Sequence, residues 1–288
     1  MNNSTSKKIT QAFAFNLFRL MSLILVLILV AILSFIVVRG IGVISWDFIT
    51  KMPEEGMTKG GIKPAIIGTL YLVAGSMLFA FPLGMLSGIY INEYAPENLF
   101  KRFIKLMTNN LAGIPSIVFG LFGMSLFVNT LGFGDSIIAG SLTLGLLALP
   151  VIIRVTEEAL KSIDKYHREA SYALGATKLQ TIRRVVLPMA MPNIITGLIL
   201  SIGRVSGETA PILFTVAAYF LPKLPTSMYD QVMALPYHLY VLSTSGTNME
   251  ESRAMAYGTA LILILIVLIL NLIANATRRF LNKKVKQD

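Results

Sequence analysis

Residues 169–211 read EASYALGATKLQTIRRVVLPMAMPNIITGLILSIGRVSGETAP, a polar segment that runs directly into an apolar one. The apolar part begins at Pro188, yet it contains an arginine and a glutamate four residues apart, Arg204 and Glu208. Ionisable residues inside a membrane helix are costly, usually face a protein interior or water, and mark functional sites. The stretch therefore predicts a polar helical hairpin joined to a membrane helix that carries a charged pair.

The composition of the whole chain is typical of a membrane protein. Of its 288 residues, 55% are hydrophobic and 14% are charged, and the mean hydropathy is +0.70, whereas a soluble domain has about 25% charged residues. A spanning helix needs about 20 apolar residues, and six runs meet this requirement. They are Leu20–Val38, Pro64–Asn92, Leu106–Gly134, Ser136–Ile153, Pro188–Ala218 and Ala254–Thr277. Six spans place both termini on one side of the membrane, and we expect no cleavable signal peptide because the first run is too long.

The distribution of lysine and arginine predicts the orientation. Most of the 25 basic residues fall on one side, in the segments Lys7–Arg19, Lys101–Lys105, Arg154–Arg184 and Arg278–Lys286. Because basic residues accumulate on the cytoplasmic side, we expect both termini and the Arg154–Leu187 loop to be cytoplasmic.

Two external loops and one proline complete the predicted topology. The Gly40–Lys63 loop is Gly-rich and reads as an irregular linker. The Tyr219–Arg253 loop has three prolines between apolar patches and is predicted to form an interfacial or re-entrant lip. Pro115 should kink the third spanning run because it removes a backbone donor.

The Arg154–Leu187 loop is much longer than the about 2–8 residues of an ordinary connection between helices. Asp164 can cap one short helix, Gly175 suits the left-handed position that ends it, and Thr177 with Gln180 forms a capping box that starts the next. Two interpretations stay open. The hairpin is either a solvated or lipid-associated connector, or a docking element whose exposed apolar side chains fit a groove on another protein.

The Arg204–Glu208 pair also has two interpretations. Gly203 is the midpoint of the Met189–Ala217 segment, so we expect Arg204 near the centre of the bilayer. Arginine before glutamate at i, i+4 is the weaker order for an intrahelical pair, and the proline at 211 loosens the helix. Three small residues leave space around the pair: Gly203, Ser206 and Gly207. The pair is either a functional site or a structural salt bridge that fixes the helix.

Three elements of the hairpin resemble the EAA loop of ABC-importer permeases: Glu169-Ala170-Ser171, Gly175 and Leu187-Pro188. In addition, GRVSGETAP at Gly203–Pro211 resembles the GRxxGETAP signature of phosphate-specific importers. The GETAP ending is more similar to their A-type permease, the PstA family, than to the C-type partner.

The resemblance extends roughly from Pro64 to Thr277. GIPSIVFGLFG at Gly113–Gly123 and GIYINEYA at Gly88–Ala95 are similar to the same subfamily. One departure is Asp164–His167, where many relatives carry a proline before the loop helix.

The resemblance implies an all-α integral membrane protein with six transmembrane helices, the type I ABC importer permease fold and cytoplasmic termini. It divides the chain into a cytoplasmic N-terminal tail (1–16), a first transmembrane helix with its external loop (17–63), the permease domain (64–277) and a basic cytoplasmic tail (278–288). The implied substrate path consists of Arg204, Ser206, Glu208 and Thr209. The implied ATPase-coupling loop includes Glu169, Ala170, Ser171, Gly175, Leu187 and Pro188.

The implied function is that of a permease subunit of an ATP-driven importer of inorganic phosphate in a prokaryotic plasma membrane. The implied partners are a second phosphate permease, two cytosolic ATP-binding subunits, an external phosphate-binding protein and membrane lipid. The alternatives are an importer of another solute, and an ATP-independent channel or carrier that uses the charged pair alone.

The residues that the chain lacks exclude several other functions. No G-x-x-x-x-G-K-[ST] motif occurs, so the chain cannot form an ATPase phosphate loop; we expect no enzyme activity, with ATP hydrolysis on a separate subunit. There are no cysteines, and His167 and His238 fall on opposite sides of the membrane, so we expect neither a metal site nor a cofactor. Basic residues sort by membrane side, which argues against a nucleic-acid surface.

Overall fold

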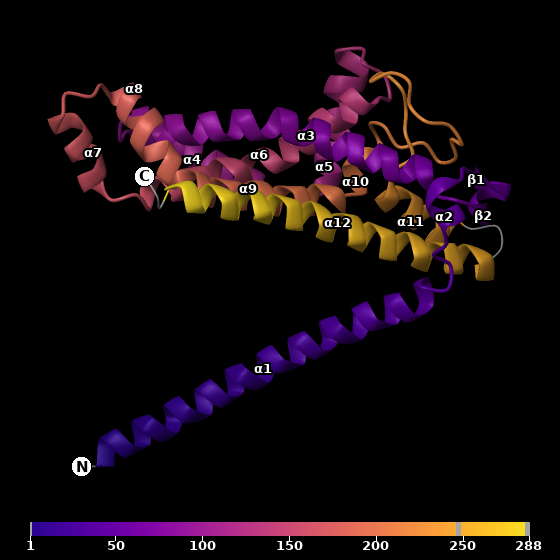
Figure 1. The fold of residues 1–288 in the computed structure, drawn as a ribbon, viewed down its shortest axis with the longest axis horizontal. Coiled ribbons are helices and arrows are strands. Elements are labelled where there is room, and N and C mark those ends of the chain that lie inside the picture. Colours follow the sequence, from indigo (N-terminus) through magenta and orange to yellow (C-terminus); the bar gives the residue numbers. More distant parts are fainter. Residues whose placement is uncertain (1, 246–248, 286–288) are drawn as a thin grey trace.

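The computed structural model describes residues 2–245 and 249–285 of the chain. The elements are α1 (Asn2–Gly40), α2 (Trp46–Thr50), β1 (Pro53–Glu54), η1 (Glu55–Met57), β2 (Lys59–Gly60), α3 (Lys63–Ile89), η2 (Tyr90–Tyr94), α4 (Leu99–Leu111), α5 (Ser116–Gly123), η3 (Met124–Thr130), α6 (Ile137–Lys161), α7 (Lys165–Ala173), α8 (Lys178–Thr181), η4 (Ile182–Val186), α9 (Leu187–Ser206), α10 (Ala210–Leu213), α11 (Leu235–Thr244) and α12 (Met249–Val285). The structure contains a bundle of long helices with a helical hairpin, formed by α7 and α8, at one end (Figure 1). At the other end lies a small cap, formed by α2 and the strands β1 and β2.

Five helical segments of the described chain are long and apolar enough to cross a membrane: α1, α3, α6, the continuous segment Lys178–Ser206, and α12. The pair α4 and α5 makes a sixth span if its two halves are counted together. The predicted all-α membrane architecture is therefore confirmed, with one small antiparallel hairpin of β1 and β2 added to it.

The third predicted span is broken rather than kinked. Its helices α4 and α5 differ in direction by 102°, and the break ends at Pro115, whose φ of −56° and ψ of 137° lie outside the helical region. Proline fixes φ and cannot donate a backbone hydrogen bond. The expectation of a proline effect here is therefore confirmed, but the helix also begins earlier than predicted, at Leu99.

The core of the bundle lies where α3, α6 and α9 meet. Leu72 and Met77 of α3, Leu144 and Ile152 of α6, and Val205 of α9 are buried in one cluster. Small residues allow this close approach: a Cβ placed on Gly84 of α3 would lie 2.6 Å from Ile152. Without a hydrophobic driving force between helices in lipid, such close van der Waals packing is a main source of association.

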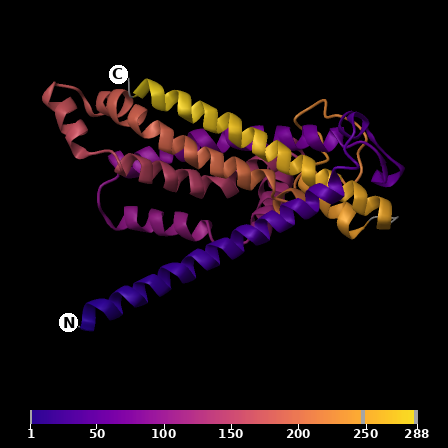
Figure 2. The same ribbon diagram turned by 60° about the horizontal axis from the view of Figure 1, so that its bottom comes forward.

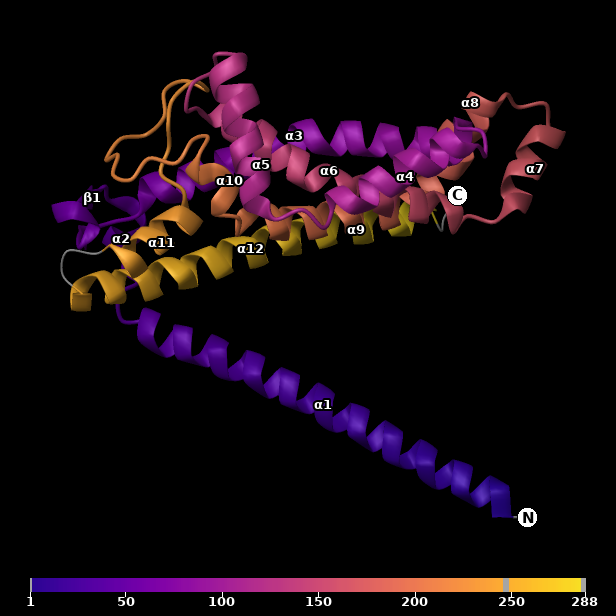
Figure 3. The ribbon, with the colours of Figure 1, turned by 180° about the vertical axis from the view of Figure 1, so that it is seen from behind.

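Helix α1 diverges from the bundle along most of its length (Figure 3). It meets α12 only near its end, where the Phe35 and Tyr257 rings pack edge to face at 5.6 Å. Helix α1 also continues without interruption through most of the 1–16 segment, which the sequence analysis assigns to a tail. The first turn of α1 and the last turns of α12 lie at the same end of the molecule as α7 and α8 (Figure 1).

Two predictions about the remaining segments are wrong. The Gly40–Lys63 loop is not an irregular linker, because α2 and the β1–β2 hairpin fold it onto the bundle and bury Phe48 and Met57. The bounds of the Pro188–Ala218 span are also wrong, because the spanning helical segment is Lys178–Ser206, α9 ends at Ser206 and only the short helix α10 follows. Between Tyr219 and the start of α12 at Met249, the described residues contain one helix, the short α11, which is not long enough to span a membrane.

Candidate functional site

The hairpin formed by α7 and α8 has the capping residues that the sequence predicts. Asp164 starts α7 by accepting a hydrogen bond from the amide of Tyr166 at 3.0 Å. Gly175 follows the end of α7 with φ of +81°, a left-handed conformation that favours glycine. Thr177 and Gln180 form a complete capping box, with the Thr177 amide donating to Gln180 at 2.8 Å.

The outer surface of this hairpin is free of contacts with its own bundle. No residue of α7 is buried. Tyr166 and Leu174 are 75% and 90% exposed, and Leu179 and Tyr172 are also exposed. Glu169, Ala170 and Ser171 lie on α7, so the EAA-like residues form part of a projecting helix. Apolar side chains on such a helix are a suitable docking surface for a groove on another protein.

The hairpin is nevertheless anchored at its base by Arg168. Its guanidinium contacts the carboxylate of Glu93 at 2.7 Å and donates to the carbonyls of Leu160 and Ile163 at 2.9 and 2.8 Å. Both charged side chains are largely buried. Arg168 thus ties α7 to η2, which continues α3, and to the end of α6.

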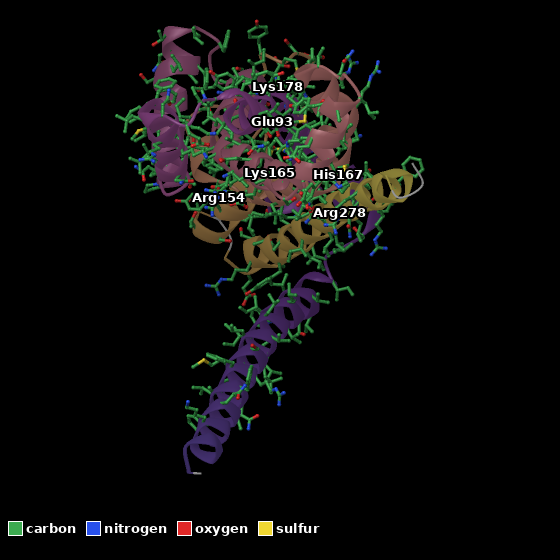
Figure 4. The ribbon with its side chains drawn as sticks, turned by 90° about the vertical axis from the view of Figure 1, so that its left-hand side faces the viewer. Glu93, Arg154, Lys165, His167, Lys178 and Arg278 are labelled. Carbon is green, nitrogen blue, oxygen red and sulfur yellow. The ribbon has the colours of Figure 1, made fainter. Side chains whose placement is uncertain are left out.

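A second contact ties α8 to the same end of α3. The ammonium of Lys178 lies 4.9 Å from the centre of the Tyr94 ring, a cation–π distance. Figure 4 looks onto this end of the molecule with Glu93, Lys165 and Lys178 labelled. Sequence reasoning missed both ties; Glu93 and Tyr94 belong to the GIYINEYA segment, but nothing local indicates their distant partners.

A single helical rod leads from the hairpin into the bundle. Helices α8, η4 and α9 run without a break from Lys178 to Ser206. The rod passes Pro188, which has no amide hydrogen to donate. Just before it, a π turn carries the Leu187 amide to the carbonyl of Ile182. The Leu187-Pro188 element is therefore inside the rod, not at a boundary.

Arg204 and Glu208 lie at the far end of this rod. The Nε of Arg204 and the Oε1 of Glu208 are 3.4 Å apart, with side chains 36% and 18% exposed. The helix ends between them, at Ser206, so Gly203 is not the midpoint of a continuous span as predicted.

Contacts with the neighbouring helix α12 locate the Arg204–Glu208 pair along the bundle. The guanidinium of Arg278, near the C-terminal end of α12, donates to the hydroxyl of Thr196 at 3.1 Å. Two turns further along, a Cβ on Gly203 would lie 3.8 Å from the amide nitrogen of Asn271. Asn271 lies two turns, about 10 Å along the helix axis, before Arg278. Arg204 therefore lies beside the apolar part of α12, away from the basic end of that helix.

The pair faces open space along one side of α9. Leu200 and Gly207 are exposed, and a Cβ on Gly207 would meet nothing closer than 3.9 Å. Thr209 is partly exposed beside them. Ser206 does not belong to this face: it is buried and donates to the carbonyl of Ile202 at 2.7 Å. The structure thus brings together three of the four predicted path residues and turns Ser206 away.

Asn271 is a polar residue of this region that sequence reasoning missed. The oxygen of its side-chain amide is buried and has no hydrogen-bond partner among the described residues. Together with Asn275 it interrupts the apolar run ALILILIVLILNLIANA, and amides in such a run were the available signal.

A family model described as binding-protein-dependent transport system inner membrane component matches residues 80–287. The chain is 37% identical over 292 residues to the probable ABC transporter permease protein YqgI of Bacillus subtilis (strain 168), covering 97% of this chain and 99% of that protein. It is 42% identical over 258 residues to the phosphate transport system permease protein PstA of Mycobacterium leprae (strain TN), covering 87% and 82%.

Solved structures share the fold. A chain from a bacterial ABC transporter involved in the import of the acidic polysaccharide alginate superposes with a TM-score of 0.67 at 18% identity, over 96% of this chain and 99% of that chain. A chain of the MetNI methionine ABC transporter superposes with a TM-score of 0.59 at 20% identity, over 75% and 94%. Both similarities concern the arrangement of the helices.

Proposed function

The chain belongs to the family of binding-protein-dependent transport system inner membrane components, and from this premise we propose that it forms the membrane path of an ATP-driven importer of inorganic phosphate. It is a multi-pass permease subunit and not an enzyme. Family membership implies association with ATP-binding subunits and a substrate-binding protein. The phosphate cargo is supported by its similarity to the phosphate permeases named PstA.

The chemistry of the Arg204–Glu208 pair fits this cargo. A guanidinium offers forked donors that match a phosphate oxyanion, and Arg204 uses only its Nε in the contact with Glu208. Inorganic phosphate near neutral pH still carries at least one proton, because it has one more ionisable hydroxyl than the phosphoserine monoester, whose second pKa is about 6. Glu208 can accept that proton in a hydrogen bond, which fully deprotonated oxyanions cannot offer.

The open face around Arg204 requires a second chain. An arginine in contact with lipid at the bilayer centre costs about 2.5–3.5 kcal/mol on insertion scales. A second, related permease packed against this side of α9 would remove Arg204 from lipid and enclose a path between the two chains. Gly203 and Gly207 would leave room in that path for a solvated ion.

The continuous rod from Lys178 to Ser206 is the observation that carries the proposal. It joins the exposed hairpin directly to the charged pair, and Arg168 and Lys178 tie the hairpin to α3 as well. Two cytosolic ATPases that close on ATP would displace α7 and α8, and the rod would carry this displacement to Arg204 and Glu208. An ATP-independent carrier has no need of a projecting hairpin with an exposed apolar surface.

Substitution of Gly175 tests the proposal. Gly175→Val forces a β-branched residue into a left-handed conformation and deforms the turn between α7 and α8, so the ATP-binding subunit should no longer co-purify and phosphate uptake should be lost. Gly132→Val is the matched control, because Gly132 also has positive φ and open surroundings but lies far from the hairpin. Normal uptake by a Gly175→Val protein that has lost its ATPase would exclude ATP-driven import.

A further inference from the structure

Helix α4 has an apolar face that points away from the bundle and a polar face that points toward it, the reverse of a surface helix in a soluble protein. Its apolar side chains point outward, with Leu99, Phe100 and Phe103 exposed by 81%, 65% and 56%. Its polar side chains Lys105 and Thr108 point toward α6. Figure 2 shows α4 standing beside the bundle, joined to it by a loop. An apolar outer surface suits contact with lipid, and the polar inner surface requires a polar environment.

A polar cavity of about 230 Å³ lies between α4 and α6 on the side of the hairpin. Its charged lining comprises Lys105, Arg154 and Lys161 with Glu157 and Glu158. One carboxylate oxygen of Glu157 forms ion pairs with the ammonium groups of Lys105, at 2.6 Å, and Lys161, at 2.5 Å. The carboxylate of Glu158 accepts a hydrogen bond from the Nε of Arg154 at 2.9 Å. Three cations thus share two carboxylates, so the lining carries an excess of one positive charge and unused donors on Arg154.

An apolar cavity of about 380 Å³ continues from the polar one. Thr108 and Ile153 line both cavities. The apolar part is otherwise surrounded by side chains such as Leu146 and Leu149 of α6 and Val118 and Phe122 of α5. The 102° bend between α4 and α5 forms its outer wall.

The polar cavity followed by the apolar one matches the polar headgroup and the acyl chain of one lipid molecule, both in order and in distance. From Arg154 to Leu146 the α6 axis runs about 12 Å away from the hairpin end, and half of the hydrocarbon core is about 15 Å thick. We propose that this composite cavity is a binding site for an anionic phospholipid of the leaflet on the hairpin side. The phosphodiester lies among Arg154, Lys105 and Lys161, and an acyl chain occupies the apolar part.

The excess positive charge of the cavity lining favours an anionic lipid over a zwitterionic one. A phosphatidylglycerol headgroup carries one negative charge, which neutralises the excess positive charge of the lining, whereas a zwitterionic headgroup brings its own ammonium. Basic pockets between membrane helices on the cytoplasmic side are suited to anionic headgroups. The site is separate from the cargo path, because none of the described residues that line these cavities comes from α9.

A tryptophan reporter tests the proposal on the full-length chain with its co-purifying subunits. The chain has one tryptophan, exposed Trp46 in the cap, so Trp46→Phe combined with Phe122→Trp places a single fluorophore in the apolar cavity. Phosphatidylglycerol with brominated acyl chains should quench it at a mole fraction about tenfold lower than brominated phosphatidylcholine does, the size expected for one charge-assisted hydrogen bond.

Two further variants check the headgroup contact. Arg154→Gln should abolish the preference for phosphatidylglycerol, while Arg102→Gln, an exposed cation on α4 outside the cavities, should leave it unchanged. Equal quenching by the two lipids in the parent protein would overturn the proposal. So would the absence of quenching, which indicates a protein segment in the cavity, or relief of quenching by free inorganic phosphate, which indicates a cargo site.

Discussion

His238 shows how the surroundings of one residue create a property that its position in the sequence does not indicate. It lies on α11 with only 2% of its surface exposed, among buried residues such as Leu235 and Val241. Neither ring nitrogen has a hydrogen-bond partner among the described residues. Burial lowers the pKa of the His238 imidazole from 6.5 to about 4, so the folded lip holds this histidine in its neutral form.

Acidification should therefore destabilise the packing of α11 around His238. Below pH 6.5 the imidazole of residue 238 binds a proton in the unfolded chain, but in the folded chain it does so only near pH 4. The free energy of unfolding therefore falls as the pH drops from 6.5 to 4, by about 3 kcal/mol in total. Thermal denaturation of the detergent-solubilised protein between pH 8 and 4.5 measures the loss. His238→Leu should flatten the dependence, and His167→Leu, at the exposed second histidine, should not. A steep acid dependence in His238→Leu would contradict this assignment.

Glu208 is the residue expected to select protonated phosphate. Glu208→Gln keeps the size of the side chain but replaces one acceptor oxygen by a donor, so the preference for phosphate over sulfate should fall about tenfold to a hundredfold. Competition of sulfate with labelled phosphate during uptake measures this ratio. Glu55→Gln, which removes the carboxylate of another i, i+4 pair, is the control. An unchanged ratio in Glu208→Gln would exclude the role.

At the scale of elements, the sequence predicts the helix caps of the hairpin but not the contacts that attach the hairpin to the bundle. Its caps at Asp164, Gly175 and Thr177 follow from local backbone chemistry, and the structure confirms all three. The tie between Arg168 and Glu93 joins residues 75 positions apart, and no local pattern predicts it. The attachment determines whether a displacement of α7 reaches α3 and α6 or is lost in a flexible loop.

Breaking that tie should loosen the hairpin without unfolding the bundle. Arg168→Gln leaves the buried Glu93 carboxylate without its cation, and removal of one partner of a buried pair costs about 3–5 kcal/mol. We expect amide hydrogen exchange in residues 164–176 to accelerate at least tenfold, while the exchange of α6 stays slow. Lys165→Gln removes an exposed charge on the same helix and should have no such effect. Equal exchange in both variants would show that the tie does not restrain α7.

At the scale of the whole molecule, the projecting α1 and the open side of α9 are surfaces that the described chain does not cover itself. From Phe13 to Phe35 the large apolar side chains of α1 are exposed, which is tolerable only against lipid or another membrane helix. Both ends of the described chain lie at the hairpin end of the bundle (Figure 1). The start of α1 and the described part of the Arg278–Lys286 segment thus lie at the end of the hairpin, in agreement with the single side that the distribution of lysine and arginine predicts for both termini.

Single cysteines can assign that end to a membrane side, because the chain has none of its own. Leu174→Cys lies on the hairpin and Met228→Cys on the opposite loop, both at exposed positions. A membrane-impermeant maleimide should label Met228→Cys in intact cells and Leu174→Cys only after permeabilisation. The reverse pattern would invert the topology and remove the hairpin from the cytosolic ATPases.

The sequence by itself determined the properties that depend on local and compositional physics. Apolar runs of sufficient length are spanning helices because lipid cannot satisfy backbone groups, and the caps of α7 and α8 follow from side chains within three residues. The same reasoning failed where a boundary depends on distant packing. Apolar composition continues past Ser206, but α9 ends there, and Phe48 folds a predicted linker onto residues far along the chain.

Only the tertiary structure decided which polar groups meet. Arg168 with Glu93, Arg278 with Thr196, and the cationic lining between α4 and α6 each combine residues from separate helices. Their geometry follows from how helices pack and where one breaks, and these depend on interactions between segments rather than within them. The sequence predicts that Arg204 is buried in the membrane, and the packing of α9 against α12 decides that it faces an open side.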